Sequence, residues 1–212
     1  MNPLFVSFYS GDSYYEHCSK SLLNNCKNLG IEIEIEKSGG YREYWKNTLH
    51  KPSFIYDKLK SLKKDLVWID VDTNILSYHE CFKKWDCDIL FSSHTGNIEG
   101  IKASPLCIKY NERTLDFMRD LKDLCDQKIR SNDIDLDHDV LKYEILPKFK
   151  GRIWIDVMDD TKLKASDFSD GAIINNGISR VRDKSIYMSE VIRKNSKRNS
   201  DFQSLLLKDF IV

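Results

Sequence analysis

The stretch LVWIDVDTNIL, Leu66 to Leu76, places two aspartates directly behind a short apolar run. The run itself has the composition of a buried β-strand. In an open α/β sheet, ligands bind beyond the carboxyl ends of the strands. Because Asp70 and Asp72 are two residues apart on a chain that we expect to be extended there, their side chains are predicted to point the same way at that edge.

Two like charges held together are unfavourable unless a cation or strong hydrogen-bond donors neutralise them. Hard divalent cations such as Mn²⁺ or Mg²⁺ fit carboxylate oxygens and keep positions open for phosphate oxygens. Asp70 and Asp72 are therefore candidate metal ligands for a substrate that carries a diphosphate. The spacing leaves one alternative open, a solvated turn after a strand in which Asp72 caps the next segment.

The Asp-x-Asp spacing is not specific on its own. It occurs five times, at 70/72, 86/88, 133/135, 135/137 and 137/139, and we single out the first pair because it follows an apolar strand. A similar phrase, RIWIDVMDDT at 152–161, lacks this spacing and has no Lys-Pro helix before it. We interpret it as a second core strand and not as a repeat.

The rest of the chain alternates strand-like and helix-like patterns, which predicts an α/β sheet covered by helices on both faces. Strands are expected at 4–10, 31–37, 66–70, 87–93, 104–110 and 152–158, and helices at 13–30, 53–64, 111–129 and 140–149. Pro52 suits the start of the second helix. The strict alternation of IEIEIEK (31–37) favours a half-exposed strand near the edge of the sheet.

The 212 residues suffice for one compact domain with a sizeable core. We expect that domain at 1–190, and a C-terminal extension at 191–212 that packs back onto it. The 33 basic and 33 acidic residues give a net charge near zero, so charge gives no general argument for binding nucleic acid or an anionic membrane. No segment resembles a signal peptide or a membrane span, which predicts a cytoplasmic protein.

The chain contains six cysteines and no Cys-x-x-Cys pair. Free, buried thiols in a reducing compartment are the expected state. A zinc site that combines Cys81, Cys87 and either His79 or His94 is a less favoured alternative, because the spacing does not match a zinc knuckle.

The longer stretch KPSFIYDKLKSLKKDLVWIDVDTNIL (51–76) resembles the signature of nucleotide-sugar glycosyltransferases with the GT-A fold. The resemblance implies a single Rossmann-like mixed sheet sandwiched by helices, and a strand-ending Asp-x-Asp that holds Mn²⁺ or Mg²⁺ on the donor diphosphate. It implies a UDP-sugar or similar donor and a glycan or glycoprotein acceptor. The small size and Lys/Asn-rich composition also resemble glycosyltransferase domains of large algal viruses, which modify capsid glycans.

The stretch VSFYSGDSYYEHC (6–18) resembles the nucleotide-binding first strand and turn of the glycogenin-like branch. By that resemblance Asp12 and Tyr14 seat the base, and Tyr9 and Tyr15 compete with Tyr14 for the stacking role. The other donor contacts that the resemblance implies are Ser7, Ser10, Gly11, Lys51, Asp70 and Val71.

Two later stretches complete the resemblance. DHDVL (137–141) resembles an Asp-Gln-x-Leu-Leu element near the donor sugar, which implies that Asp137 and His138 orient the donor of a retaining enzyme; Asp139 is the candidate base if the enzyme inverts. INNGISR (174–180) resembles a His-x-x-Gly-x-x-Lys element. Arg180, with Lys184 as its alternate, then replaces the phosphate-binding lysine. Ile174 stands where the family has a metal-binding His, which leaves Asn175, a neighbouring aspartate or water to complete the metal shell.

Two other functions remain open at this point. Ile174 in place of the family's histidine is compatible with a nucleotide-sugar-binding domain that does not turn over its ligand. An Asp-x-Asp behind a strand also resembles phosphohydrolases that would use Asp70 as a nucleophile, although the order of the later acids, DDT at 159–161, fits that class poorly.

Overall fold

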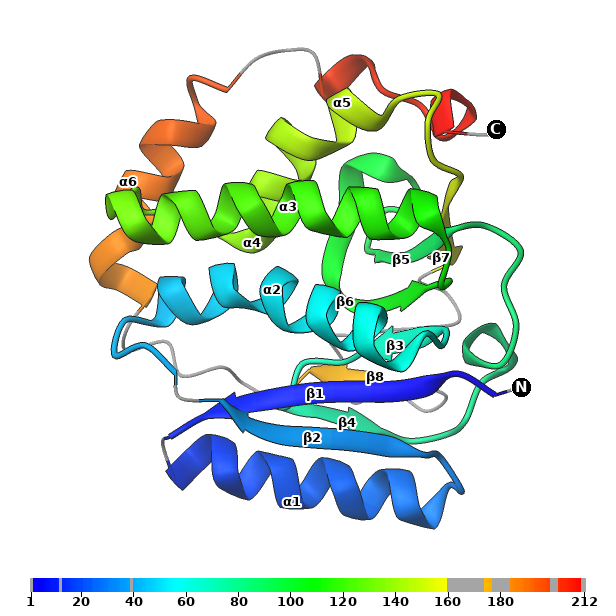
Figure 1. Cartoon of the computed structure of the whole chain (residues 1–212). Helices are drawn as coiled ribbons and strands as arrows, with labels where there is room; N and C mark the ends of the chain where they lie inside the picture. The colour runs from blue at the N-terminus through cyan, green and yellow to red at the C-terminus, as the bar shows by residue number, and fades with distance from the viewer. Residues whose placement is uncertain are drawn as a thin grey trace.

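A six-stranded mixed sheet forms the centre of the molecule (Figure 1), in a computed structural model that describes residues 2–11, 13–38, 40–159, 174–176, 184–198 and 202–210. The strands lie in the order β2-β1-β3-β6-β5-β7. Their bounds are Leu4–Ser10 (β1), Ile33–Ser38 (β2), Leu66–Trp68 (β3), Ile89–Ser93 (β5), Ile101–Ile108 (β6) and Ile155–Asp159 (β7). β1 is parallel to β2 and β3, β5 is parallel to β7, and β6 runs antiparallel between β3 and β5.

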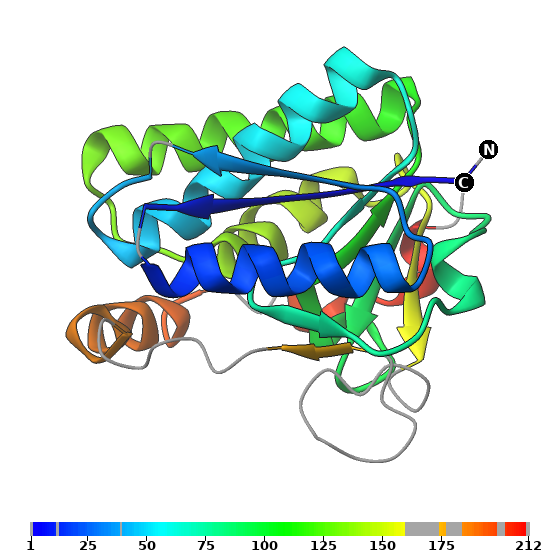
Figure 2. The ribbon, with the colours of Figure 1, turned by 90° about the horizontal axis from the view of Figure 1, so that it is seen from below.

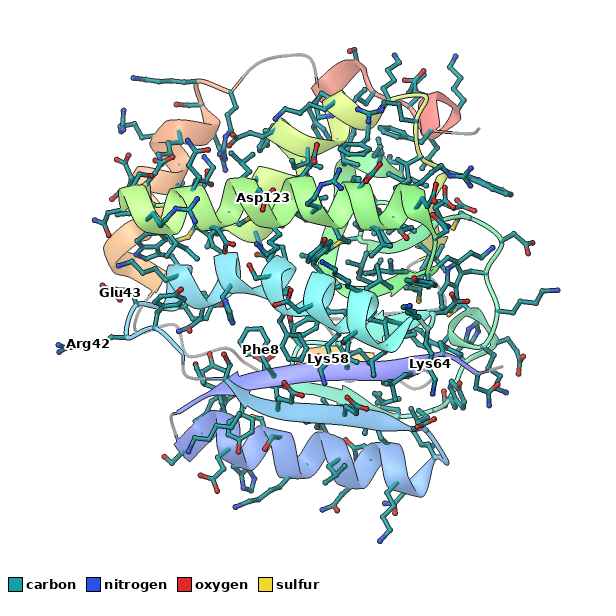
Figure 3. The ribbon with its side chains drawn as sticks, in the orientation of Figure 1. Phe8, Arg42, Glu43, Lys58, Lys64 and Asp123 are labelled. Atoms are coloured by element: carbon teal, nitrogen blue, oxygen red, sulfur yellow. The ribbon has the colours of Figure 1, made fainter. Side chains whose placement is uncertain are left out.

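Helices cover both faces of this sheet. Helix α1 (Ser13–Asn28) lies on the opposite side of β1 and β2 from α2 (Tyr44–Leu62) and α3 (Glu112–Ser131), as Figure 2 shows. Successive side chains of β1 point to opposite faces of the sheet and pack in two hydrophobic cores. Leu4, Val6 and Phe8 lie in the core on the side of α2 and α3, and Phe5 lies in the core on the side of α1. Phe8 is one of the side chains labelled in Figure 3. The predicted α/β fold is confirmed, as is the edge position of β2.

The shorter elements surround the sheet. They are α4 (Asp137–Val140), a π-helical turn (Leu141–Ile145), α5 (Leu146–Phe149), α6 (Lys184–Asn195) and 3₁₀ turns at Glu80–Phe82, Ile98–Gly100, Phe202–Ser204 and Leu207–Phe210. The helical stretch that we predicted at 140–149 therefore begins three residues earlier, at Asp137. None of the helices in the described part of the chain is long and apolar enough to cross a membrane.

The prediction that a helix starts at Pro52 is wrong, because α2 begins at Tyr44 and passes through Pro52. A proline inside a helix removes one backbone hydrogen bond. The buried face of α2 nevertheless continues on both sides of it, with Trp45 and Leu49 before and Ile55 and Leu59 after. Packing of this face against the sheet outweighs the lost hydrogen bond. As a result Lys51 lies in the middle of a rigid helix.

A second, two-stranded sheet was not predicted from the sequence. β4 (Thr73–Ile75) directly follows Asp72 and pairs antiparallel with β8 (Ile174–Asn176). Asn74 lies opposite Asn175 in this ladder. The pairing therefore brings a segment from late in the chain beside the turn that contains Asp70 and Asp72.

The C-terminal residues pack on the same core as α3 and α5. Val191, Phe202, Leu205 and Phe210 are all buried in the cluster that includes the sheet face under α2 and α3. Helix α6 runs across position 190, where we placed the boundary of the extension. That boundary stays a prediction.

Candidate active site

A cavity of about 670 Å³ opens where β1 and β3 end. β6 runs antiparallel to its neighbours, so its first residues meet the carboxyl ends of β1 and β3 at this edge. The backbone N–H of Asp70 donates a hydrogen bond to Ser104 Oγ at 2.9 Å, which ties the end of β3 to the start of β6. The cavity therefore lies where ligands of open α/β sheets bind.

The predicted carboxylate pair lies in a turn and not on an extended chain. β3 ends at Trp68, and the N–H of Thr73 donates to the carbonyl of Asp70 at 3.0 Å, which closes a turn over 70–73. Asp70 and Asp72 both still line the cavity, and the largely buried Val71 lies between them. The turn thus directs both carboxylates to the same space, for a different reason from the one we predicted.

Lys51 links the Asp-x-Asp turn to the helical stretch at 137. Its Nζ lies 3.0 Å from Asp70 Oδ1 and 2.7 Å from Asp137 Oδ2. Burial on its own would lower the pKa of Lys51, but the carboxylates of Asp137 and Asp70 outweigh it and hold that pKa above its usual range. The indole N–H of Trp68 also donates to Asp70 Oδ1, at 3.1 Å.

Asp137 is buried as deeply as its lysine partner. Burial would raise the pKa of Asp137, but Lys51 and then His138 outweigh this and hold the pKa below its usual range. Lys51 and Asp137 are therefore both charged at neutral pH, as an ion pair that forms one wall of the cavity.

His138 lies between two carboxylates on the first turn of α4. Its Nδ1 is 3.8 Å from Asp137 Oδ1, and its Nε2 is 3.5 Å from Asp139 Oδ1. The imidazole is partly exposed to the cavity, whereas Asp139 is buried. The three residues that we predicted to act near the donor sugar thus meet the Asp-x-Asp turn at one cavity.

The tyrosines that line the cavity do not include Tyr14, the residue that we predicted to stack on the base. Tyr9, Tyr15 and Tyr44 line the cavity, whereas Tyr14 is not among its lining residues. The Tyr14 ring instead meets the ring of Tyr15 edge to face, with centroids 5.1 Å apart. Tyr9 and Tyr15, which we named as competitors for the stacking role, thus line the cavity together with Tyr44.

The other predicted donor contacts divide into three groups. Ser10 lines the cavity, whereas Ser7 is fully buried and Gly11 is exposed away from it. The backbones of Asn175 and Lys184 belong to β8 and α6, but their side chains lie outside the described part of the structure, as do Asp12 and Arg180 altogether.

Several lining residues were missed by sequence reasoning. Two lysines, Lys102 from β6 and Lys142 from the π-helical turn, line the cavity, and so does His94. Helix α6 supplies a largely apolar wall formed by Met188, Val191, Ile192 and Asn195. Lys142 could have been found, because it lies four residues after His138 and so on the same face of a continuous helical stretch.

The donor set at the turn fits a divalent cation that is shared with a substrate. Asp70 and Asp72 offer oxygen ligands at an open cavity, which suits ions that bind through one or two carboxylates plus phosphate oxygens. Among the described residues, no three His, Cys, Asp or Glu side chains are grouped to hold a metal by themselves. The zinc alternative at Cys81 and Cys87 therefore finds no support there.

No protein-family model and no curated protein sequence matches the chain. Among solved structures, it is similar to a glycosyltransferase involved in the glycosylation of the major capsid of PBCV-1, with a TM-score of 0.65, 12% identity, and coverage of 89% of this chain and 100% of the other. It is also similar to the apo form of the glycosyltransferase GlyE of Streptococcus pneumoniae TIGR4, with a TM-score of 0.55, 12% identity, and coverage of 92% and 64%. At this identity the likeness establishes the fold, which is that of these glycosyltransferases.

Proposed function

We propose that this protein is a glycosyltransferase that moves a sugar from a nucleotide diphosphate donor, preferentially a UDP-sugar, to a glycan or protein-linked acceptor. One observation carries the proposal. In a fold shared with glycosyltransferases, Asp70 and Asp72 face the same cavity as the buried Lys51–Asp137 ion pair, at the carboxyl edge of the sheet.

In this proposal Asp70 and Asp72 hold Mn²⁺ or Mg²⁺ against the donor diphosphate. The cation, when bound, supplies stabilisation of the negative charge that develops on the leaving nucleoside diphosphate. Lys51 fixes the direction of the Asp70 carboxylate, since it contacts that carboxylate and is itself held by Asp137. Asn175 is proposed as a further ligand because its strand pairs with β4, directly after Asp72.

We assign recognition of the nucleotide to the residues of β1 and α1 that line the cavity. Tyr9 or Tyr15 stacks on the base, and Ser10 at the end of β1 lies beside them. Asp12, Arg180 and Lys184 keep the roles that the resemblance implied, toward the base and the diphosphate. Stacking of a base on an aromatic ring contributes about 1–3 kcal/mol, so Tyr15 and Tyr9 are the positions at which alanine should weaken UDP binding.

Retention of anomeric configuration is the favoured outcome. Lys51 keeps Asp137 ionised with a pKa below its usual range, which suits orientation of donor hydroxyls better than proton abstraction. His138 is the partly exposed group at the same turn and shares that role. Nuclear magnetic resonance of the first-formed product tests this point, and a product anomer opposite to the donor's would promote Asp139 to the general base.

The acceptor is proposed by analogy with the viral neighbour. That neighbour is involved in glycosylation of a major capsid, and we propose a protein-linked glycan, including capsid glycans, as the acceptor class here.

The sharpest test of the function changes one carboxylate of the turn. Asp72→Asn should lower sugar transfer about 100-fold or more, as is typical when one stabilising group of a charged transition state is removed. Its melting temperature should stay close to that of the wild type, because Asp72 lies at the cavity surface. Transfer is measured with a panel of UDP-sugars in Mn²⁺ and again after chelation.

Asp123→Asn is the matched control, since Asp123 lies on α3 (Figure 3) with an exposed side chain, outside the cavity lining. Normal transfer by Asp72→Asn, or a rate that chelation leaves unchanged, would contradict the metal assignment. Donor binding without any transfer or hydrolysis would favour a non-catalytic binding domain, and phosphate release from a simple phosphomonoester would favour a phosphohydrolase.

A further inference from the structure

Two of the lysines that line the cavity have no role in the donor site proposed above. Lys102 and Lys142 come from different elements, β6 and the π-helical turn, and both line the cavity with half-buried side chains. Like charges brought together at a concave surface are unfavourable unless an anion or a carboxylate neutralises them. The two lysines therefore need a neutralising group, either from the protein or from a ligand.

The carboxylates of the cavity are largely engaged elsewhere. Asp70 and Asp137 are both bound to Lys51, and Asp139 Oδ1 lies 3.5 Å from His138 Nε2. Among the described residues, neither Lys102 nor Lys142 has a carboxylate oxygen within 4.0 Å, and Lys142 Nζ donates only to the backbone carbonyl of Glu99, at 3.2 Å. Asp139 attracts Lys142 over a longer distance.

The local backbone supports a built site. Lys142 belongs to a π-helical turn, Leu141–Ile145, and such turns are frequent at functional sites. Asp139 and His138 precede Lys142 by three and four residues, so all three lie on one helical face and line the cavity. Burial lowers the pKa of Lys142 most; Asp139 opposes this, and the like charge of Lys102 adds to the lowering.

The position of the pair relative to the Asp-x-Asp turn indicates which part of the substrate it meets. Ser104 contacts the backbone of Asp70, and Lys102, two residues earlier in β6, lines the same cavity. Because β6 runs antiparallel to β3, Lys102 lies farther than Ser104 beyond the end of β3, and Lys142 follows His138 on the helical stretch that lines the same cavity. A donor whose diphosphate lies at Asp70 and Asp72 would place its sugar, or the acceptor that attacks it, near these lysines.

We propose that Lys102 and Lys142 form a subsite for an anionic group, a carboxylate or a phosphate, carried by the transferred sugar or by the acceptor. This inference rests on the proposed function and names its substrate class more narrowly. Two ammonium groups on one anion give charge-assisted hydrogen bonds, which are among the stronger polar contacts in proteins.

The test compares probes that differ only in one charge. Calorimetry in Mn²⁺ measures the affinity of the wild type for UDP, UDP-glucose and UDP-glucuronate, which gives the donor arm. Methyl β-glucoside and methyl β-glucuronide, tested as acceptors with a donor that is turned over, give the acceptor arm. We expect the charged member to be preferred at least about tenfold in one of the arms.

Substitution then assigns the preference to the pair. The double variant Lys102→Gln/Lys142→Gln should lose most of that preference, whereas the control Lys148→Gln, on the exposed side of α5, should keep it. The proposal is overturned if the wild type prefers the neutral member in both arms, or if the double variant keeps the preference. An equal loss of affinity for UDP itself would assign the lysines to the diphosphate instead.

The anionic subsite and the proposed glycosyltransferase function can be refuted separately. A wild type that binds UDP and transfers a neutral sugar, with no preference for charge, leaves the proposed function standing and removes the anionic subsite. A wild type that binds no nucleotide in Mn²⁺ removes both.

Discussion

Lys51 shows how one residue can serve both the fold and the site. Its ammonium group is buried in the middle of α2 and holds two carboxylates that come from separate parts of the chain, Asp70 and Asp137. Removing one partner of a buried ion pair typically costs about 3–5 kcal/mol, because the remaining charge is left buried and unpaired. Lys51 was predicted to meet the donor, and the structure adds that it fixes the carboxylates that would do so.

Lys51→Met should therefore destabilise the protein, and the loss should depend on pH. In the wild type the pKa of Asp137 is held low, so the stability it contributes is present above its unfolded pKa and is lost only as the pH falls through the folded value. Without Lys51, burial dominates and raises the pKa of Asp137, so the folded variant binds a proton more readily than the unfolded chain. We expect a loss of about 3 kcal/mol at pH 7, which becomes smaller at pH 5, in urea unfolding curves.

Lys58→Met is the matched control for this measurement. Lys58 lies two turns later in the same helix (Figure 3) and pairs with Glu34 and Glu36 at the surface. The two carboxylates are 43% and 54% exposed and so stay solvated when Lys58 is removed. Pairs with such carboxylates contribute about 0–1 kcal/mol, so this variant should lose little stability and show no extra pH dependence between pH 5 and 7. A Lys51→Met protein with the same stability and pH profile as Lys58→Met would contradict the buried-pair interpretation.

At the scale of single elements, Asp88 joins three of them. This carboxylate at the start of β5 is almost fully buried and accepts hydrogen bonds from Arg113 Nε at 2.7 Å, Asn111 Nδ2 at 2.8 Å and the backbone N–H of Trp154 at 3.0 Å. It thereby fixes the start of α3 and the start of β7 against the sheet. The same Asp-x-Asp spacing that marks the site at 70/72 is structural at 86/88.

Asp88→Asn should lower the free energy of unfolding by about 2 kcal/mol, because hydrogen bonds to a charged group are replaced by weaker ones. Burial would raise the pKa of Asp88, but Arg113 and the other donors hold it below its usual range. The stability it contributes is thus present above its unfolded pKa and is lost as the pH falls through the folded value, so the gap between variant and wild type should begin to narrow below about pH 4. Urea unfolding at pH 7 and about pH 2.5 measures this, and Asp86→Asn, on an exposed neighbour, should show no such gap.

Local patterns predicted most elements and failed where distant segments meet. The apolar run before Asp70, the alternation of 31–37 and the helical spacing of 111–129 each depend on neighbours in sequence, and the structure contains β3, β2 and α3 at these places. The passage of α2 through Pro52 and the β4–β8 ladder depend on packing between remote segments. The same holds for the site. Asp70, Asp72 and Lys51 belong to a motif that is contiguous in the sequence, whereas Lys102 and the cavity-lining residues of α6 belong to no such motif.

At the scale of the whole molecule, an ionic cluster joins Arg198, three residues after the end of α6, to the core. Asp135 is fully buried; Lys128 Nζ lies 3.1 Å from its Oδ2, and Arg198 donates to the same oxygen. Glu144 accepts from the same two cations, at 2.9 Å from Lys128 and 3.0 Å from Arg198. Arg198 also donates to Asn195 Oδ1 at 2.6 Å, and Asn195 is one of the α6 residues that line the cavity, so the cluster helps to position that wall of the site.

Arg198→Gln should therefore loosen α6 without unfolding the domain. The variant leaves the buried carboxylate of Asp135 with one cation in place of two, and detachment of the C-terminal segment lets water reach it. Hydrogen exchange followed by mass spectrometry should show faster exchange at 188–195, with α3 and β1 unchanged. Arg193→Gln is the matched control, since Arg193 pairs with Glu190 on the exposed side of the same helix. Equal exchange at 188–195 in the two variants would show that the contacts of α6 itself hold the helix, through buried Val191 and through Lys194, which contacts Asp133 and the carbonyl of Ile134.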